Sequence, residues 1–322
     1  MRLIKFFFDI IFLKKKKLLP KKNELVIFSS DSNEKLETIL LGHKNYTVLP
    51  AFNENQIFII PLIKGLFSYK NFTEAYQASF LKYADAKYLI NFHDDYTKLA
   101  KSAKKVNVKT FYIQNGKRDE FCFNDNSNPY IDYYFAQSKN WVDYANKLIK
   151  SNFVISGSIQ NNCFKFAKFK KVKKIQLISH YSNSDNIIAG GKLKRGAKAA
   201  WEIDIKKSTQ ILSKVIQEFA KVHNLEIEVL LRRRGKSEEE NNFFKNLGFK
   251  VKKSKISKND YWKENYLNAS EEAIIVSDSS DTMAYELFSR KYRVAFFSLR
   301  SYLTETQSFS FDWPIKHEKK GL

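Results

Sequence analysis

Residues 273–288 read AIIVSDSSDTMAYELF, an apolar run that ends in hydroxyl and carboxylate side chains and then becomes helical. The apolar residues 273–276 suit a strand of a parallel sheet, which is covered on both faces. Residues 277–280 are good N-caps, and Asp281 fits a first helical turn. A helix N-terminus at the carboxyl end of such a strand offers free N–H groups and the positive end of the helix dipole. The stretch therefore predicts a parallel α/β fold with a phosphate-binding strand–helix junction. Tyr285, Leu287 and Phe288 are expected to form the packing face of its helix.

The chain has 322 residues, enough for two domains, and 43% of them are apolar. Its net charge of +22, from 56 Lys and Arg against 34 Asp and Glu, predicts anionic partners. Nucleic acid is not the expected partner, because the lysines are spread out and no zinc-finger, KH or RRM pattern occurs. An AT-biased genome would account for the same lysine content. The two cysteines form neither a disulfide framework nor a metal-binding pattern.

Residues 1–20, MRLIKFFFDIIFLKKKKLLP, combine an apolar run with four consecutive lysines. The run is too short to span a bilayer and has no signal-peptide cleavage site. On a helix, six apolar side chains would share one face beside residues 14–17: Leu3, Ile4, Phe7, Phe8, Ile11 and Phe12. This pattern predicts a peripheral anchor on the anionic cytoplasmic face of the membrane. An ordinary first helix that packs on the protein accounts for it as well.

Strands and helices alternate twice along the rest of the chain, which predicts two Rossmann-like domains with parallel sheets facing a cleft. The expected N-terminal domain covers residues 21–165, with strands at 25–30, 46–49, 88–92, 110–113, 131–135 and 153–155 and helices at 33–41, 73–86, 95–105 and 140–149. The expected C-terminal domain covers residues 174–322, with strands at 174–178, 227–231, 273–276 and 292–297 and helices at 208–222, 238–247 and 259–267. The lysine-rich segment between the domains marks their boundary. On helix 208–222, five apolar residues are expected to point inward: Ile211, Leu212, Val215, Ile216 and Phe219.

Polar residues follow several strands of the N-terminal domain, where ligands of such sheets bind. The expected acceptor-side residues are Gln114, Asn115, Gly116, Gly157 and Ser158. Candidates for general-base work are His93, Asp94, Asn115 and Asp119. Gly116 would permit positive φ and a close backbone approach to a ligand. A plain turn at 114–116 and an N-cap role for Asp94 or Asp95 on helix 95–105 explain these residues equally well.

In the C-terminal domain, His180 follows a strand and could touch a donor. Arg232 and Arg234 close the next strand, where guanidinium groups suit a diphosphate. The sequence has no dinucleotide-binding glycine pattern, P-loop, serine-hydrolase elbow or zincin motif, which argues against those enzymes. It also lacks an Asp-x-Asp metal motif, and we expect no metal and no cofactor.

Three segments together resemble the GT-B transferases of bacterial surface polysaccharides: 110–118 (TFYIQNGKR), 132–162 and 276–297. The resemblance is strongest to surface carbohydrate biosynthesis proteins and more distant to Kdo transferases and CDP-glycerol glycerophosphotransferases. It implies a glycosyltransferase that uses a CMP-, CDP- or UDP-linked sugar and a lipid-linked or polysaccharide acceptor.

By this resemblance, Ser279, Ser280 and Thr282 would hold the donor phosphate, and Glu286 would contact the donor. Asn115 stands where the teichoic acid enzymes carry a catalytic histidine, so that role does not transfer. GT-B chains usually finish with a helix that crosses back to the first domain. Residues 311–322 are not expected to form such a helix, which would suit a truncated member of the family. The alternatives are a CDP-polyol-dependent polyol-phosphate transferase and a non-catalytic protein that binds anionic lipid or polymer.

Overall fold

The computed structural model describes residues 14–29, 45–52, 54–68, 71–116, 129–179, 181, 205–231, 238–252, 264–278 and 281–297. The chain divides into two compact units, Met1–Cys163 and Phe164–Leu322, which are described separately. The helix expected at 33–41, the apolar part of the N-terminal segment and the chain end beyond residue 297 lie outside the described residues.

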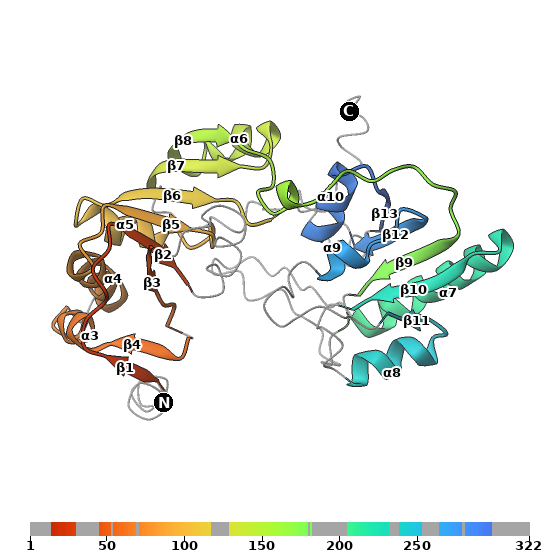
Figure 1. The fold of residues 1–322 in the computed structure, drawn as a ribbon, viewed down its shortest axis with the longest axis horizontal. Coiled ribbons are helices and arrows are strands. Elements are labelled where there is room, and N and C mark those ends of the chain that lie inside the picture. Colours follow the sequence, from red (N-terminus) through yellow and green to blue (C-terminus); the bar gives the residue numbers. More distant parts are fainter. Residues whose placement is uncertain are drawn as a thin grey trace, which may run out of the picture. The chain divides into compact units, whose positions relative to one another are not determined.

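Unit 1 contains a six-stranded sheet with the strand order β3-β2-β5-β6-β7-β8 (Figure 1). The strands are β2 (Leu25–Phe28), β3 (Thr47–Leu49), β5 (Tyr88–Asn91), β6 (Lys109–Ile113), β7 (Tyr130–Ala136) and β8 (Lys150–Ile155). Each neighbouring pair is parallel. The accompanying helices are α4 (Phe72–Tyr83), α5 (Lys98–Lys104) and α6 (Lys139–Ala145). This parallel α/β arrangement confirms the Rossmann-like prediction for unit 1.

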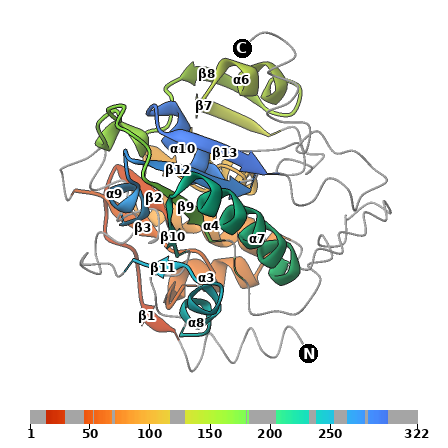
Figure 2. The same cartoon turned by 90° about the vertical axis from the view of Figure 1, so that its right-hand side faces the viewer.

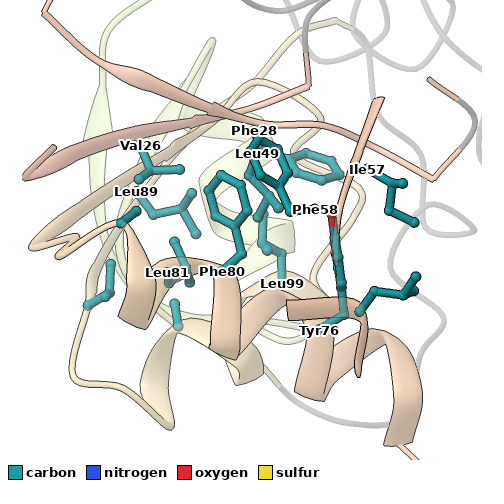
Figure 3. Close-up of a cluster of buried hydrophobic side chains, with 14 residues drawn as sticks. Val26, Phe28, Leu49, Ile57, Phe58, Tyr76, Phe80, Leu81, Leu89 and Leu99 are labelled. Carbon is teal, nitrogen blue, oxygen red and sulfur yellow. The ribbon is translucent and has the colours of Figure 1, made fainter. Parts of the chain in front are cut away.

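The main core of unit 1 lies between α4 and the sheet, as Figure 3 shows. Phe80 of α4 is fully buried and meets the ring of Phe58 edge-on, with 4.9 Å between ring centroids. Val26, Leu49 and Leu89 from three neighbouring strands are also fully buried in this cluster. The β-branched and leucine side chains of the strands therefore form the apolar surface that α4 covers.

A second, two-stranded sheet pairs β1 (Lys15–Lys17) with β4 (Gln56–Phe58) in parallel. These lysines were predicted to flank an amphipathic helix, and no sequence pattern predicted β4 or the helix that follows it, α3 (Ile59–Leu66). The strand carries exposed lysines. The strand is stabilised by backbone pairing with β4 and not by burial of its side chains. It therefore has no apolar periodicity from which it could be predicted.

Unit 2 contains a five-stranded parallel sheet with the order β11-β10-β9-β12-β13. The strands are β9 (Lys174–Ile178), β10 (Glu226–Leu230), β11 (Lys250–Val251), β12 (Ala273–Asp278) and β13 (Arg293–Phe297). The helices are α7 (Ile205–His223), α8 (Glu238–Asn246), α9 (Glu264–Asn268) and α10 (Thr282–Ser289). Unit 2 is therefore also Rossmann-like, as predicted.

Helix α7 packs on β9 and β10, and Figure 2 shows it running along this part of the sheet. Leu212 and Ile216 are buried there, as predicted. The prediction was wrong for Ile211, Val215 and Phe219, which are 51%, 48% and 46% exposed. The apolar stripe of α7 is wider than the face that one sheet can cover, so its outer half remains in solvent.

A buried carboxylate links the two central strands of unit 2. Glu228 of β10 accepts hydrogen bonds from Lys174 Nζ and Gln176 Nε2 of β9, both at 2.9 Å. Burial acts to raise the pKa of Glu228, but these bonds and the Lys174 charge outweigh it, so the pKa lies below its ordinary value. A lowered folded-state pKa stabilises the protein above the unfolded-state pKa, and this stabilisation is lost as the pH falls through the folded-state pKa.

We expect Glu228→Gln to lower the free energy of unfolding by roughly 1 kcal/mol at pH 7. The deficit should shrink as the pH falls below about 4, where the wild-type carboxylate takes up a proton. Thermal unfolding followed between pH 3 and pH 7 measures both effects. Glu226→Gln is the matched control, because Glu226 lies 3.9 Å from Lys250 with both side chains exposed. Equal effects of the two variants would contradict the role of Glu228.

Candidate functional site

The strand orders fix where a ligand would bind in each unit. In a doubly wound parallel sheet, ligands occupy the crevice beyond the carboxyl ends of the strands where the strand order reverses. In unit 2, β10 and β11 follow β9 in the chain and lie on one side of it in the sheet. The later strands β12 and β13 lie on the other side of β9. The reversal therefore lies between β9 and β12. In unit 1 it lies between β2 and β5, by the same reasoning.

At the reversal point of unit 1, β2 leads into Ser29 and β5 leads into His93. Ser29 is buried with φ of +72°, and its hydroxyl donates to Glu54 Oε1 at 2.6 Å. Asn91 Oδ1 accepts from His93 N at 2.9 Å, and Asn91 Nδ2 donates to His93 O at 3.0 Å. These bonds close a tight turn that leaves the imidazole half-buried, edge-on to the Phe28 ring with 6.1 Å between centroids.

Asp94 joins three strands rather than capping a helix. It is fully buried and accepts from Asn115 N at 3.1 Å and from Tyr134 OH at 2.5 Å. The N-cap of α5 is Thr97, which makes no side-chain capping bond, so the predicted capping role of Asp94 or Asp95 is wrong. The carboxylate of Asp94 instead ties the end of β5 to the turn after β6 and to β7.

The turn after β6 is held by hydrogen bonds to residues that follow β7 and β8. Gln114 Oε1 accepts from Gln137 N at 2.7 Å, and Gln114 Nε2 donates to Gly116 O at 2.8 Å. Asn115 Oδ1 accepts from Gln160 Nε2 at 2.9 Å. Gln160 was not predicted, because nothing in the sequence distinguishes it from other polar loop residues.

The loop after β8 brings the remaining acceptor-side candidates near this edge. Gly157 has φ of +69°, and no atom lies within 4 Å of the position that a Cβ would take. Glycine is therefore required by the backbone conformation and not by a close neighbour. Ser158 Oγ accepts from Asn161 N at 3.3 Å. Asp119, the other base candidate, lies outside the described residues.

At the reversal point of unit 2, β12 leads into helix α10. Asp281 is the N-cap, and its side chain accepts from Ala284 N at 3.2 Å. The expectation that a residue among 277–280 caps the helix, with Asp281 in its first turn, is therefore wrong. Ser277 is fully buried in β12, and Thr282 opens the helix half-buried. The other predicted donor residues lie outside the described residues: His180, Arg232, Arg234, Ser279 and Ser280.

Glu286 is buried on α10 and accepts a hydrogen bond from Tyr266 OH of α9. Burial, followed by the charge of Glu286, raises the pKa of Tyr266. The predicted packing face needs one correction: Leu287 is fully buried and Tyr285 stacks on Phe296 at 4.6 Å, but Phe288 is 56% exposed. The tie between Glu286 and Tyr266 fixes the orientation of α10 beside β12.

Arg290 follows Glu286 by one helical turn and is 3% exposed. Its guanidinium carbon lies 4.7 Å from the ring centre of Phe164, 5.3 Å from Tyr266 and 5.4 Å from Tyr292. Its Nε and Nη2 atoms have no hydrogen-bond partner among the residues that the structure describes. Burial lowers the pKa of Arg290. The surrounding aromatic rings therefore help to stabilise this cation.

A buried polar pair that no sequence pattern predicted lies at the end of β9. Ser179 Oγ donates to Glu240 Oε1 of α8 at 2.5 Å, and both residues are about 1% exposed. Tyr181 N donates to Ser179 Oγ at 3.1 Å. No sequence pattern distinguishes Glu240, which is the third of three consecutive glutamates. The pair holds the β9 side of the reversal point in place.

The described part of the chain contains neither a candidate metal cluster nor a candidate membrane-spanning helix. Among these residues, no group of three or more His, Cys, Asp or Glu side chains could hold a metal ion. No helix within the same ranges is long and apolar enough to cross a membrane.

The two described sheets with their strand-order reversals define a parallel, Rossmann-like α/β protein. A family model described as "putative O-antigen biosynthesis protein" matches residues 111–322. This is more than half of the chain, and the protein therefore belongs to that family. No curated protein matches the sequence significantly. The family confirms the predicted involvement in surface polysaccharide biosynthesis.

Proposed function

We propose that the protein is a GT-B-type glycosyltransferase of O-antigen biosynthesis that uses a CMP-, CDP- or UDP-linked sugar. Unit 2 would bind the nucleotide donor, and unit 1 would bind a lipid-linked or polysaccharide acceptor. The observation that carries the proposal is the strand reversal between β9 and β12, where α10 begins. Membership of an O-antigen biosynthesis family supports the same pathway.

The donor phosphate would bind at the start of α10. First-turn N–H groups and the helix dipole favour an anion there, and the Thr282 hydroxyl adds a donor. Ser279, Ser280, Arg232, Arg234 and His180 would complete the site from the adjoining strand ends. Because no metal motif accompanies these residues, the two arginines would neutralise the charge that develops on the leaving nucleotide.

His93 would serve as the acid–base group on the acceptor side. Three observations support this choice: it follows β5 at the reversal point, its imidazole is half-buried, and the Asn91 turn fixes its backbone. Histidine is the most common general acid–base side chain, which suits proton transfer from an acceptor hydroxyl. Asp94 is less suited to this step, because its carboxylate already accepts from Asn115 N and Tyr134 OH.

We place the protein at the cytoplasmic face of the membrane, where residues 1–20 would contact anionic lipid. The apolar and lysine-rich composition of that segment supports this location. A membrane-bound acceptor would then be within reach of the acceptor-side edge of unit 1.

Nucleotide binding tests the proposal most directly. We expect one of CMP, CDP and UDP to raise the thermal unfolding temperature, because a ligand that binds only the folded state stabilises it. Thr282→Val should weaken that nucleotide roughly fivefold to tenfold through loss of one hydrogen bond. Ser289→Ala, at the other end of α10, is the matched control and should bind normally. A titration followed by thermal shift gives the affinities.

Turnover distinguishes the reactions that this architecture could support. Sugar transfer from the matching nucleotide sugar supports the proposal, whereas turnover of CDP-glycerol or CDP-ribitol alone would replace it with a polyol-phosphate transferase. No thermal shift with any of the three nucleotides would contradict a nucleotide-dependent function altogether.

A further inference from the structure

Residues 164–173, FKFAKFKKVK, interleave aromatic and basic side chains. We call them the basic aromatic segment. They belong to unit 2, where they precede β9. The proposed transferase chemistry gives this segment no role.

The backbone of the basic aromatic segment is held in place on unit 2. Ala167 N donates to Arg290 O at 2.8 Å, and Lys168 N donates to Glu271 Oε1 at 2.9 Å. Arg293 Nη2 donates to Lys170 O at 2.6 Å. These bonds anchor the segment to the turn before β12 and to the end of α10 and β13. It is therefore a fixed surface.

Two phenylalanine side chains of the basic aromatic segment are exposed to solvent. Phe166 is 65% exposed and Phe169 is 72% exposed. Lys291 Nζ lies 5.5 Å from the ring centre of Phe166, and the Arg293 guanidinium carbon lies 5.3 Å from that of Phe169. Burying a phenylalanine is favourable by about 1.5 to 3 kcal/mol, so a partner that covered both rings would gain affinity.

The charges around the two rings are predominantly positive. Lys165, Lys168 and Lys171 are exposed, and none of them forms an ion pair with another residue that the structure describes. The nearby carboxylates pair with other lysines, since Glu271 pairs with Lys170 and Glu272 pairs with Lys173, each at 2.9 Å. The surface therefore presents exposed lysines beside exposed rings.

We propose that the basic aromatic segment, with Lys291 and Arg293, docks on an anionic lipid membrane. Lysines beside a membrane are attracted to anionic headgroups, and aromatic rings insert at the boundary between headgroups and acyl chains. A single-stranded nucleic acid would also accept lysines and rings. The membrane fits better because the family works on surface polysaccharide, for which a lipid-linked acceptor is expected. The proposal depends on that location and not on which nucleotide is used.

Co-sedimentation with vesicles tests the docking surface on the full chain. Vesicles of phosphatidylcholine alone are compared with vesicles that contain phosphatidylglycerol. We expect binding only to the anionic vesicles, weakened by salt. Lys165→Gln/Lys168→Gln should reduce the affinity by roughly thirtyfold, at about 1 kcal/mol for each lysine. Phe166→Ser/Phe169→Ser should reduce it at least as much.

Two variants on α7 are the matched controls, because they change charge and apolar surface equally elsewhere on unit 2. Lys214→Gln/Lys221→Gln removes two exposed lysines, and Val215→Ser/Phe219→Ser removes two exposed apolar side chains. Both should bind vesicles as the wild type does. Equal losses in test and control variants would overturn the proposal, since binding would then follow net charge or general apolarity.

A tryptophan probe keeps the proposal testable if a double variant fails to fold. Phe169→Trp should show a blue-shifted emission, relative to the wild-type chain, when anionic vesicles are added, and brominated acyl chains should quench the added emission. Absence of both changes would overturn the proposal. Tighter binding of a single-stranded oligonucleotide than of anionic vesicles would also overturn it. The nucleotide thermal shift measured on the same variants shows separately whether the donor site is intact.

Discussion

Replacing Asp94 with alanine is expected to lower the free energy of unfolding by roughly 2 to 5 kcal/mol. The carboxylate is fully buried and accepts from Asn115 N and Tyr134 OH, so its removal leaves the buried Tyr134 hydroxyl and the half-buried Asn115 N–H without this acceptor. Each such donor costs about 1 to 3 kcal/mol. The bond from Asn115 N also fixes the turn after β6, so the rate of sugar transfer should fall steeply as well. Chemical denaturation and single-turnover assays measure the two effects.

Two control variants distinguish the loss of the Asp94 hydrogen bonds from a general effect of losing a charge. Asp94→Asn keeps one acceptor oxygen and the size of the side chain, and it should recover most of the stability. Asp95→Ala removes the exposed neighbouring carboxylate and should change stability by less than about 0.5 kcal/mol. If alanine and asparagine at position 94 were equally tolerated, Asp94 would not join these strands.

Phe80→Ala is expected to destabilise unit 1 by about 3 to 5 kcal/mol, through lost burial and the cavity left between α4 and the sheet. Phe80 is fully buried, and its ring meets Phe58 edge-on beside Val26, Leu49 and Leu89. Denaturant unfolding followed by circular dichroism measures the loss.

The matched control lies in the same unit. Phe67 follows α3 and is 85% exposed, so Phe67→Ala removes the same atoms without opening a cavity. We expect its unfolding free energy to stay within about 0.5 kcal/mol of the wild type. A small effect of Phe80→Ala would mean that the neighbouring side chains collapse into the space, or that this core contributes little.

The longer parallel strands were predictable, because a short apolar run that ends in polar residues is typical of a buried strand. Strand β9 runs from Lys174 to Ile178, the predicted bounds, and β12 continues two residues beyond its apolar run, through Ser277 and Asp278. Strand β1 was missed because its three exposed lysines pair through the backbone alone. On α7, periodicity identified the apolar stripe but could not show which half the sheet covers.

The candidate sites were predictable to the level of strand ends and not to the level of contacts. His93, Asn115 and Thr282 lie at or next to sheet edges, as the sequence indicated. A short polar residue after a strand can either cap the next helix or bridge to another strand. Asp94 bridges to Tyr134, which is forty positions away in sequence. Glu286 likewise meets Tyr266 of another helix, a contact that local spacing does not encode.

The strands of each unit come from one continuous part of the chain. The strands of unit 1 end with β8 at Ile155, and the first strand of unit 2, β9, begins at Lys174. During synthesis, unit 1 can therefore complete its sheet before any strand of unit 2 has left the ribosome. A ribosome-bound chain that exposes residues 1–163 is expected to resist protease already, while unit 2 is still being made.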